Sequence, residues 1–302
     1  VIVIVQCGRH IKSEELEQIR ETVITFSRLS QLELAKTICE HLSWYTASGR
    51  NKVEACLKLL RRLEAQGMIR LPEKDESRSI KGKSVKCRQP TPTDRTRPGA
   101  PVVGKLSDIG TIGIRVVQEK EEVSLVNEYL HRYHYLGYKN PFGCHLRYLI
   151  EAHGSILGCM LFSGAAKAMN IRDRWVGWTA DERLRNLGFV INNNRFLIFP
   201  WVKVRYLVSH VLGKVNRSLE KDWQQRWGYR PALVETFVDP QHFDGTCYQA
   251  ANWQCLGMTS GIGLVRQGKR YKTSPKKIFV YPLVNNFRQV LCSPQTNGDD
   301  IE

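Results

Sequence analysis

Apolar residues recur at helical spacing in the first part of the chain. Ser13 and the acidic residues after it are typical of a helix start, and apolar positions follow every three or four residues over 31–41 and 51–65. Residues 68–72 have the pattern of a short strand. Three helices followed by a strand, with basic residues on the third helix, is the element order of a winged helix, in which the third helix can enter the major groove of DNA. The pattern therefore predicts a helical, winged-helix-like module over 1–73, with a plain three-helix bundle as the alternative.

The helical pattern is lost over 74–111, where basic residues alternate with prolines such as Pro90, Pro92 and Pro98. No apolar period that builds a core is present, so the segment is predicted to be a linker. Its charge suits either a flexible tether or a segment that follows a phosphate backbone.

Strand and helix patterns alternate after this segment. Runs of β-branched and aromatic residues predict the strands, and the longest helix ends at a glycine. The predicted order is strand 112–118, helix 121–132, hairpin 146–151 with 156–163, strand 196–199, helix 206–227, strand 232–238, helix 247–253, a strand directly after it, and strand 278–281. The order predicts a mixed α/β domain over 112–290 and a flexible tail over 291–302, so the fold class of the whole chain is α+β.

The chain carries a large positive charge. Its 302 residues include 45 Lys and Arg against 29 Asp and Glu, a net charge of +16. Such a charge favours a polyanionic partner, nucleic acid ahead of a membrane surface, and no apolar run reaches membrane-spanning length. The residues predicted to contact nucleic acid are Arg50, Lys52, Lys58, Arg61, Arg62, Lys81, Lys83, Lys86, Arg172, Arg174, Lys269, Arg270 and Lys272.

Nine cysteines are spread along the chain without a CxxC pair, and several lie in apolar runs. This usage is typical of reduced, buried thiols, and it predicts a cytoplasmic protein without a zinc site. The apolar opening, Val1–Val5, is too short for a signal peptide.

Polar residues crowd the end of the strand predicted over 232–238. Asp239 ends this strand, Tyr248 opens the next helix, and His134 and Tyr135 lie in a loop before the hairpin. A histidine can act as a general base and a tyrosine can donate to a developing oxyanion, so these four residues are the candidate catalytic set. The alternatives are a turn in which Asp239 accepts backbone amides, and aromatic rings that pack in a core.

A metal-dependent nuclease would need several carboxylates around one ion. His242 and Asp244 lie near Asp239 but follow no known ligand spacing, so no metal site is predicted. Other available carboxylates are Asp173, Asp181, Glu182 and Glu235. Glu235 lies in an apolar strand, where a buried acid needs a partner. Candidate partners for it are Arg183, Arg185 and Arg195.

Three stretches carry a resemblance to known families. Residues 245–253 read Gly-Thr-Cys-Tyr-Gln-Ala-Ala-Asn-Trp, and the segments His134–Gly137 and Asn192–Phe196 precede them in the same domain. With the element order, the run resembles GNAT acyltransferases, especially their phage Mom branch, which modifies adenine in DNA. The chain as a whole, including its helical first part, resembles the Druantia anti-phage defence family DruA and related domains of some transposases. The resemblance implies a GNAT-like domain, DNA as a partner, and other defence-system subunits.

One departure from the GNAT pattern concerns the cofactor. The resemblance implies acyl-CoA, whose pyrophosphate GNAT proteins hold on a glycine-rich turn before the long helix. Residues 200–209 contain no glycine. Acyl-CoA is therefore possible only without its usual turn and the cofactor stays unknown, with Lys203 and Arg205 as candidates to bind a phosphate as point charges.

The sequence leaves three hypotheses open. The favoured one is a DNA-acting component of an anti-phage defence system, which binds DNA and could modify it as an acyltransferase-like enzyme through the four candidate residues. The second is a non-enzymatic DNA-recognition subunit with a GNAT-like scaffold that has lost its cofactor. The third is a metal-dependent nuclease or a transposition-linked factor.

Overall fold

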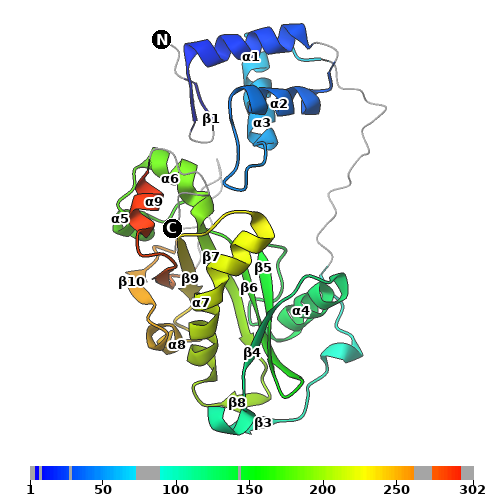
Figure 1. The fold of residues 1–302 in the computed structure, drawn as a ribbon, viewed down its shortest axis with the longest axis vertical. Helices are drawn as coiled ribbons and strands as arrows, with labels where there is room; N and C mark the ends of the chain where they lie inside the picture. The colour runs from blue at the N-terminus through cyan, green and yellow to red at the C-terminus, as the bar shows by residue number, and fades with distance from the viewer. Residues whose placement is uncertain are drawn as a thin grey trace.

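The chain forms a small helical module and a larger α/β domain (Figure 1). The computed structural model describes residues 4–6, 9–26, 29–72, 89–141, 144–261 and 274–293. Buried apolar residues form two separate clusters, one drawn from the segment up to Leu71 and the other from Ile109 onward. Each part therefore has its own core, and the predicted mixed α/β domain is confirmed.

The N-terminal module contains the three predicted helices. Ser30 shows why the second begins where it does: its hydroxyl accepts the Glu33 N–H, and the Glu33 carboxylate accepts the Ser30 N–H at 3.1 Å. The third helix buries Leu59, Leu60 and Leu63 against the other two. The helices are α1 (Ser13–Thr25), α2 (Gln31–His41) and α3 (Val53–Ala65).

The strands of this module differ from the prediction. Residues 68–72 form no strand, whereas β1 (Ile4–Gln6) and β2 (Arg9–Ile11) form a short antiparallel hairpin before α1. Leu71 is buried in the module's core, so the apolar pattern of that segment reflects packing rather than a β ladder. The winged-helix interpretation stays a prediction.

The prediction of a linker over 74–111 is wrong for residues 89–111, because these residues pack on the α/β domain. The hydroxyls of Thr93 and Thr96 donate to the buried carboxylate of Glu128 at 2.8 and 2.6 Å, and the Tyr133 hydroxyl donates to the Thr96 carbonyl at 2.7 Å. Side-chain hydrogen bonds order this segment, which is why periodicity missed it. It contains η2 (Asp94–Thr96), β3 (Val102–Gly104) and η3 (Leu106–Ile109), and it lies on α4 (Lys120–Tyr133).

The α/β domain is built on one seven-stranded sheet with the order β10-β11-β9-β7-β6-β5-β4. Every neighbouring pair in it is antiparallel except β7 and β9. The strands are β4 (Gly113–Val116), β5 (Leu146–Ala152), β6 (Ser155–Gly164), β7 (Val190–Ile198), β9 (Leu233–Val238), β10 (Gln254–Met258) and β11 (Lys277–Pro282). A further strand, β8 (Val202–Val204), pairs in parallel with β3 outside the sheet.

Helices cover both faces of the sheet. The neighbouring residues Arg147 and Tyr148 on β5 point to opposite faces: Arg147 donates to Asn127 of α4 at 2.9 Å, and Tyr148 donates to Asp222 of α7 at 2.9 Å. Gly228, with φ +79°, ends α7 as predicted. The remaining helices are α5 (Asn170–Val176), α6 (Ala180–Asn186), η4 (Leu187–Phe189), α7 (Leu207–Trp227), α8 (Thr246–Ala250) and α9 (Phe287–Cys292).

The element order predicted for this domain is confirmed, and it is the order that the resemblance to GNAT proteins implies. Strand β7 is longer than predicted because the polar run Asn192–Asn194 also belongs to it and pairs with β6. Strand β11 lies between β9 and β10, a crossover that local sequence does not indicate.

Among the described residues, the side-chain contacts between the module and the domain include an interaction of His10 and one of Arg50. His10 on β2 lies 3.1 Å from the Asp181 carboxylate on α6, and the Arg50 guanidinium lies 5.7 Å from the centre of the Trp227 ring at the end of α7. Both contacts are at the end of the domain where α7 terminates (Figure 1).

We predict that Thr96→Val lowers the free energy of unfolding by about 1–3 kcal/mol, because it leaves the buried Glu128 carboxylate without one of its donors. Urea unfolding followed by tryptophan fluorescence measures this. Thr91→Val, at an exposed position of the same segment, is the matched control and should be neutral. Equal stability of the two variants would mean that residues 89–111 are the loose linker that the sequence predicted.

Candidate functional site

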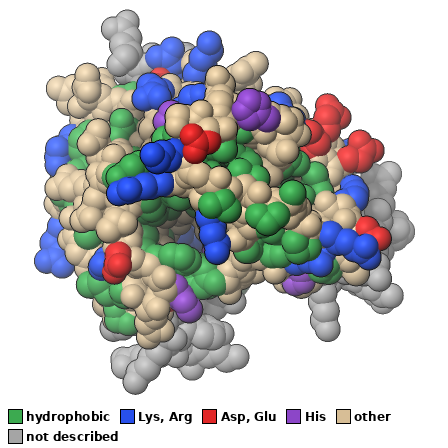
Figure 2. Space-filling model, turned by 90° about the horizontal axis from the view of Figure 1, so that it is seen from below, with side chains coloured by type: hydrophobic (Ala, Val, Ile, Leu, Met, Phe, Trp, Pro, Cys, Tyr) green, Lys and Arg blue, Asp and Glu red, His purple; other side chains and the backbone are tan. Residues whose placement is uncertain are grey.

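A cavity opens where β7 and β9 part. Their parallel ladder covers only Val190–Asn192 with Leu233–Glu235, although both strands continue. The facing edges then diverge and enclose a cavity of about 420 Å³. Figure 2 shows a face with a hollow bordered by hydrophobic side chains, with Lys and Arg side chains close to its edge. A cavity of this volume between diverging strands can accommodate a small-molecule ligand.

The cavity has apolar walls and a few polar groups. Phe196, Ile198 and Pro200 come from β7 and the turn after it, and Val208 comes from the first turn of α7. The polar lining residues include Asn193, Asn194, Thr236, His134, Tyr135 and Tyr248. Such a lining is typical of sites that bind a small organic group and orient it through hydrogen bonds.

Tyr248 is a buried donor at the base of this cavity. Its hydroxyl donates to Asn193 Oδ1 at 2.8 Å, and the Thr236 hydroxyl donates to the Asn193 carbonyl at 3.0 Å. Burial raises the pKa of Tyr248 far above its usual value, so the phenol stays protonated. The network fixes the Asn193 side chain at the point where the strands separate.

Gly245 explains the start of the Gly-x-x-Tyr run. It precedes α8 with φ +80°, and a Cβ there would lie 2.6 Å from the Phe279 ring. Only glycine fits both the left-handed backbone and this close approach. The following turn of helix then places the Tyr248 ring against Phe279, with ring centres 5.6 Å apart.

Four aromatic rings lie together at the cavity. We call this group the aromatic rim, and its members are His134, Tyr135, His242 and Phe243. The Tyr135 ring lies 5.0 Å from His134, 4.8 Å from His242 and 5.5 Å from Phe243, centre to centre. The loop after α4 and the loop after β9 are therefore in contact, although about a hundred residues separate them. The sequence placed His134 and Tyr135 in a site, and the structure brings them to the same cavity as Tyr248.

His134 is neutral at physiological pH. Its burial, with a contribution from the nearby Arg195 guanidinium, lowers its pKa to about 4. The Leu136 N–H lies 3.2 Å from Nδ1 and donates to it, so in the neutral ring the proton is on Nε2. The ring therefore offers a donor to the cavity rather than a free basic nitrogen.

Asp239 has the contacts of a turn residue. One carboxylate oxygen accepts the Gln241 N–H at 3.1 Å, and the other accepts the Ser274 hydroxyl at 3.2 Å. The Gln241 N–H and the Ser274 hydroxyl lower the pKa of Asp239 and keep it ionised. Its carbonyl accepts the N–H groups of His242 and Phe243, so Asp239 shapes the loop that carries two rings of the aromatic rim.

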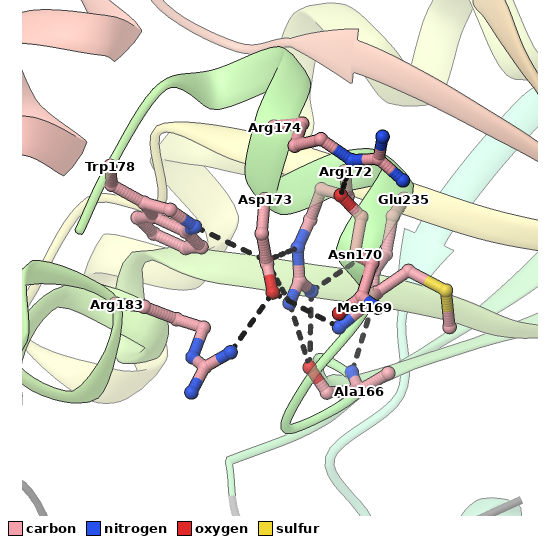
Figure 3. Close-up of polar contacts among 9 residues, drawn as sticks. All are labelled: Ala166, Met169, Asn170, Arg172, Asp173, Arg174, Trp178, Arg183 and Glu235. Carbon is pink, nitrogen blue, oxygen red and sulfur yellow. Dashed lines mark hydrogen bonds and ion pairs between the residues drawn. The ribbon is translucent and has the colours of Figure 1, made fainter. Parts of the chain in front are cut away.

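A buried ion pair fixes β9 beside the cavity (Figure 3). Glu235 and Arg172 are both 0% exposed and lie 2.8 Å apart, and Glu235 also accepts the Ala166 N–H at 2.9 Å. Burial raises the pKa of Glu235, whereas the Arg172 guanidinium opposes that shift. The three partners predicted for Glu235 are wrong, because Arg172 is its partner and Arg183 instead binds Asp173 at 3.1 Å.

The ion pair with Glu235 also shows that Arg172 is wrong as a predicted nucleic-acid contact. Arg172 is fully enclosed by Glu235, Asp173 and the Ala166 carbonyl, so it has no surface to offer a nucleic acid, whereas its neighbour Arg174 is exposed. Six of the predicted basic residues lie outside the described residues: Lys81, Lys83, Lys86, Lys269, Arg270 and Lys272.

The basic residues predicted around α3 differ in the exposure of their side chains and in what those side chains contact. Lys58 and Arg61 are exposed on α3, and the Arg62 guanidinium donates to the Val5 carbonyl at 3.1 Å. Arg50 faces the Trp227 ring and Lys52 is half-buried. Nucleic-acid binding by this set stays a prediction.

No group of three His, Cys, Asp or Glu side chains in the described part of the chain converges as a metal ligand set. Asp173 and Glu235, two of the carboxylates that a nuclease would need, are instead paired with Arg172 (Figure 3). Among the described residues, no helix has the length and apolarity to cross a membrane.

The family of the chain follows from comparison with known proteins. The model of the family described as "Druantia protein DruA" matches residues 62–268, more than half of the chain. The chain belongs to the DruA family. The match begins within α3 and includes every residue that lines the cavity. A search of curated proteins finds no match.

Solved structures similar to this DruA-family chain include several acetyltransferases. They include spermidine/spermine N-acetyltransferase SpeG from Vibrio cholerae, with 8% identity, coverage of 57% of this chain and 92% of that chain, and a TM-score of 0.34. A Bacillus subtilis acetyltransferase in complex with CoA has 8% identity, coverage of 58% and 100%, and a TM-score of 0.32. Aminoglycoside acetyltransferase AAC(6′)-Ib has 14% identity, coverage of 57% and 95%, and a TM-score of 0.36. At these values the likeness says nothing about what the DruA-family chain binds.

The start of α7 does not fit the pyrophosphate of acyl-CoA in the way that a glycine-rich turn does. Strand β8 replaces that turn, and Tyr206 precedes the helix with φ +63° and a side chain that is 64% exposed. A bulky residue at this point keeps a diphosphate from close contact with the backbone. Lys203 and Arg205 are exposed nearby, and their role as phosphate ligands stays a prediction.

Sequence reasoning missed part of the cavity. Asn193, Asn194 and Phe196 line it, yet they were read only as a stretch of resemblance. The available signal was the run of three asparagines inside a strand whose other residues, apart from Arg195, are apolar, because asparagine is depleted in strands. Thr236 and Phe243 gave no comparable signal.

We predict that His134 titrates with a pKa of about 4 in the folded protein, which NMR of the histidine rings measures, with His134→Gln to assign the signal. The unfolded ring has a pKa of about 6.5, so it binds protons that the folded ring refuses. The resulting stability is complete above pH 6.5 and is lost as the pH falls toward 4, by up to about 1.4 kcal/mol per pH unit. His134→Gln should flatten this slope. A pKa near 6.5 would show that the ring is solvated.

Proposed function

We propose that this chain is a DNA-recognising component of an anti-phage defence system. The observation that carries the proposal is the pair of exposed cations, Lys58 and Arg61, on one face of α3 in a DruA-family chain of net charge +16. Residues three positions apart on a helix project from the same side, so both can contact one phosphate backbone. Other subunits of such a system are its expected protein partners.

The chemistry of the cavity supports recognition over catalysis. His134 is neutral with Nδ1 already accepting a hydrogen bond, and Asp239 is ionised and holds a turn. Tyr248 is a buried donor with a raised pKa. A general base needs a free acceptor with a pKa near the working pH, and none of these three groups meets both conditions. A catalytic role for them, and for Tyr135, stays a prediction.

A second candidate is a DNA base modifier. The ligand-sized cavity, with open strand edges and polar groups at its base, favours it. Mass spectrometry of nucleosides from cells that carry the chain tests this directly. A modified nucleoside that disappears in Tyr248→Phe would establish the enzyme, and an unchanged nucleoside profile would leave recognition as the function.

We predict that Lys58→Ala with Arg61→Ala weakens binding of a labelled DNA duplex, measured by fluorescence anisotropy over a range of salt concentrations. Each lost phosphate contact should lower the slope of log affinity against log salt by about 0.9, so the double variant should lose about 1.8. The matched control is Lys120→Ala at the start of α4, an exposed lysine of the other domain, which should leave the slope unchanged. Equal slopes for all three proteins would contradict the role given to α3.

A further inference from the structure

Large aromatic side chains are unusually exposed around the cavity. Tyr135 is 41% exposed, Phe243 is 55% exposed and Tyr206 is 64% exposed. Tyr135 and Phe243 line the cavity, and Tyr206 comes two residues before Val208, which also lines it. Figure 2 shows hydrophobic side chains gathered around a hollow with Lys and Arg side chains beside it. Exposed apolar groups that gather at one place mark an interaction surface.

Tyr206 is held in a strained backbone conformation. Its φ of +63° lies in the left-handed region, which a bulky residue rarely adopts. The conformation directs an exposed ring outward at the start of α7, and the Arg205 guanidinium lies 4.8 Å from the centre of that ring. Strain that keeps an aromatic ring in solvent points to a function for the ring.

The aromatic rim offers a second set of ring faces. Tyr135 packs against His242 and Phe243 at 4.8 and 5.5 Å, so its ring is fixed while part of its surface remains exposed. His134 adds no charge to the rim because its ring is neutral, and the ionised Asp239 carboxylate next to the rim accepts hydrogen bonds from Gln241 and Ser274. Rigid, exposed rings bind flat ligands with little loss of side-chain entropy.

We propose that this face binds unpaired DNA. One base enters the cavity between β7 and β9, adjacent bases stack on Tyr135, Phe243 and Tyr206, and Lys203 and Arg205 bind the phosphates. Alternation of aromatic platforms with cations is the usual way in which proteins hold single strands. The inference rests on the proposed function, because it assigns the form of DNA that the α/β domain recognises.

The cavity fits a base better than it fits a duplex. Its volume of about 420 Å³ is within the range of small-molecule sites, which is about 300–1,000 Å³. The amide nitrogens of Asn193 and Asn194 each use one hydrogen within the protein, on the Arg195 carbonyl at 3.3 Å and on the Ser163 hydroxyl at 2.9 Å. The second hydrogen of each amide suits an acceptor on the edge of a base. A paired and stacked base cannot reach such groups, so the strand must be unpaired or the base extruded.

The test compares a labelled single-stranded oligonucleotide with its duplex, using fluorescence anisotropy and the full chain. Tyr135→Ala with Phe243→Ala, and separately Tyr206→Gly, should each weaken single-strand binding by about 5- to 150-fold for each lost stacking contact. Tyr206→Gly keeps the positive φ, so the backbone is not disturbed. Tyr135→Phe keeps the ring and should bind normally. Phe26→Ala, at an exposed aromatic of the N-terminal module, is the matched control.

The dependence of single-strand affinity on salt concentration separates the contribution of stacking from that of the charged residues. The aromatic variants should keep the wild-type salt slope, whereas Lys203→Gln with Arg205→Gln should lower it by about 0.7 for each phosphate. Wild-type single-strand affinity in the aromatic variants, or the same loss in Phe26→Ala, would overturn the inference.

Duplex binding distinguishes the two proposals. Duplex binding that depends on α3, without single-strand binding at the cavity face, would leave the proposed function standing and reject the inference. If the wild-type chain bound neither duplex nor single-stranded DNA, the proposed function itself would be rejected. Single-strand binding that depends on the rings, without duplex binding, would support the inference and reject the role of α3.

Discussion

The candidate site depends on where β7 and β9 stop pairing. Their ladder ends at the Asn192–Glu235 pair, and Glu235 is tied to Arg172 by a fully buried ion pair. Removing one partner of such a pair costs about 3–5 kcal/mol, because the other charge is left unpaired in a low-dielectric core. The pair thereby holds the last paired position of β9 in place, and the strands diverge beyond it. The divergence creates the cavity and leaves backbone groups at its edges.

Three distant segments complete the site once the strands have parted. The end of α4 brings His134 and Tyr135, the turn after β7 brings Pro200, and the loop after β9 brings Phe243. Each is fixed by a different interaction: residues 89–111 bind α4 through Glu128, β8 pairs with β3, and the Asp239 carboxylate shapes the last loop. The segment that sequence analysis treated as a linker therefore supports the site.

The sequence was informative where local pattern decides the structure. The order of strands and helices follows from periodicity, and Gly228 indicates the end of the long helix. The run that begins at Gly245 correctly indicates the turn and short helix that carry Tyr248. Long-range choices were out of reach. Periodicity cannot show that Glu235 pairs with Arg172 or that β11 lies between β9 and β10, because both depend on chain segments that meet only after folding. For the same reason Arg172 was assigned to a surface that it does not reach.

We propose that the helical module contacts duplex DNA through α3 and that the α/β domain binds an unpaired base. A photo-crosslinking experiment tests the second part most directly. A single-stranded oligonucleotide with one 5-iododeoxyuridine is irradiated with the full chain, and the attached peptides are sequenced by mass spectrometry. We expect crosslinks to Tyr135, Phe243 or Tyr206 around the cavity. Crosslinks confined to α3, with none at these three residues, would contradict this proposal.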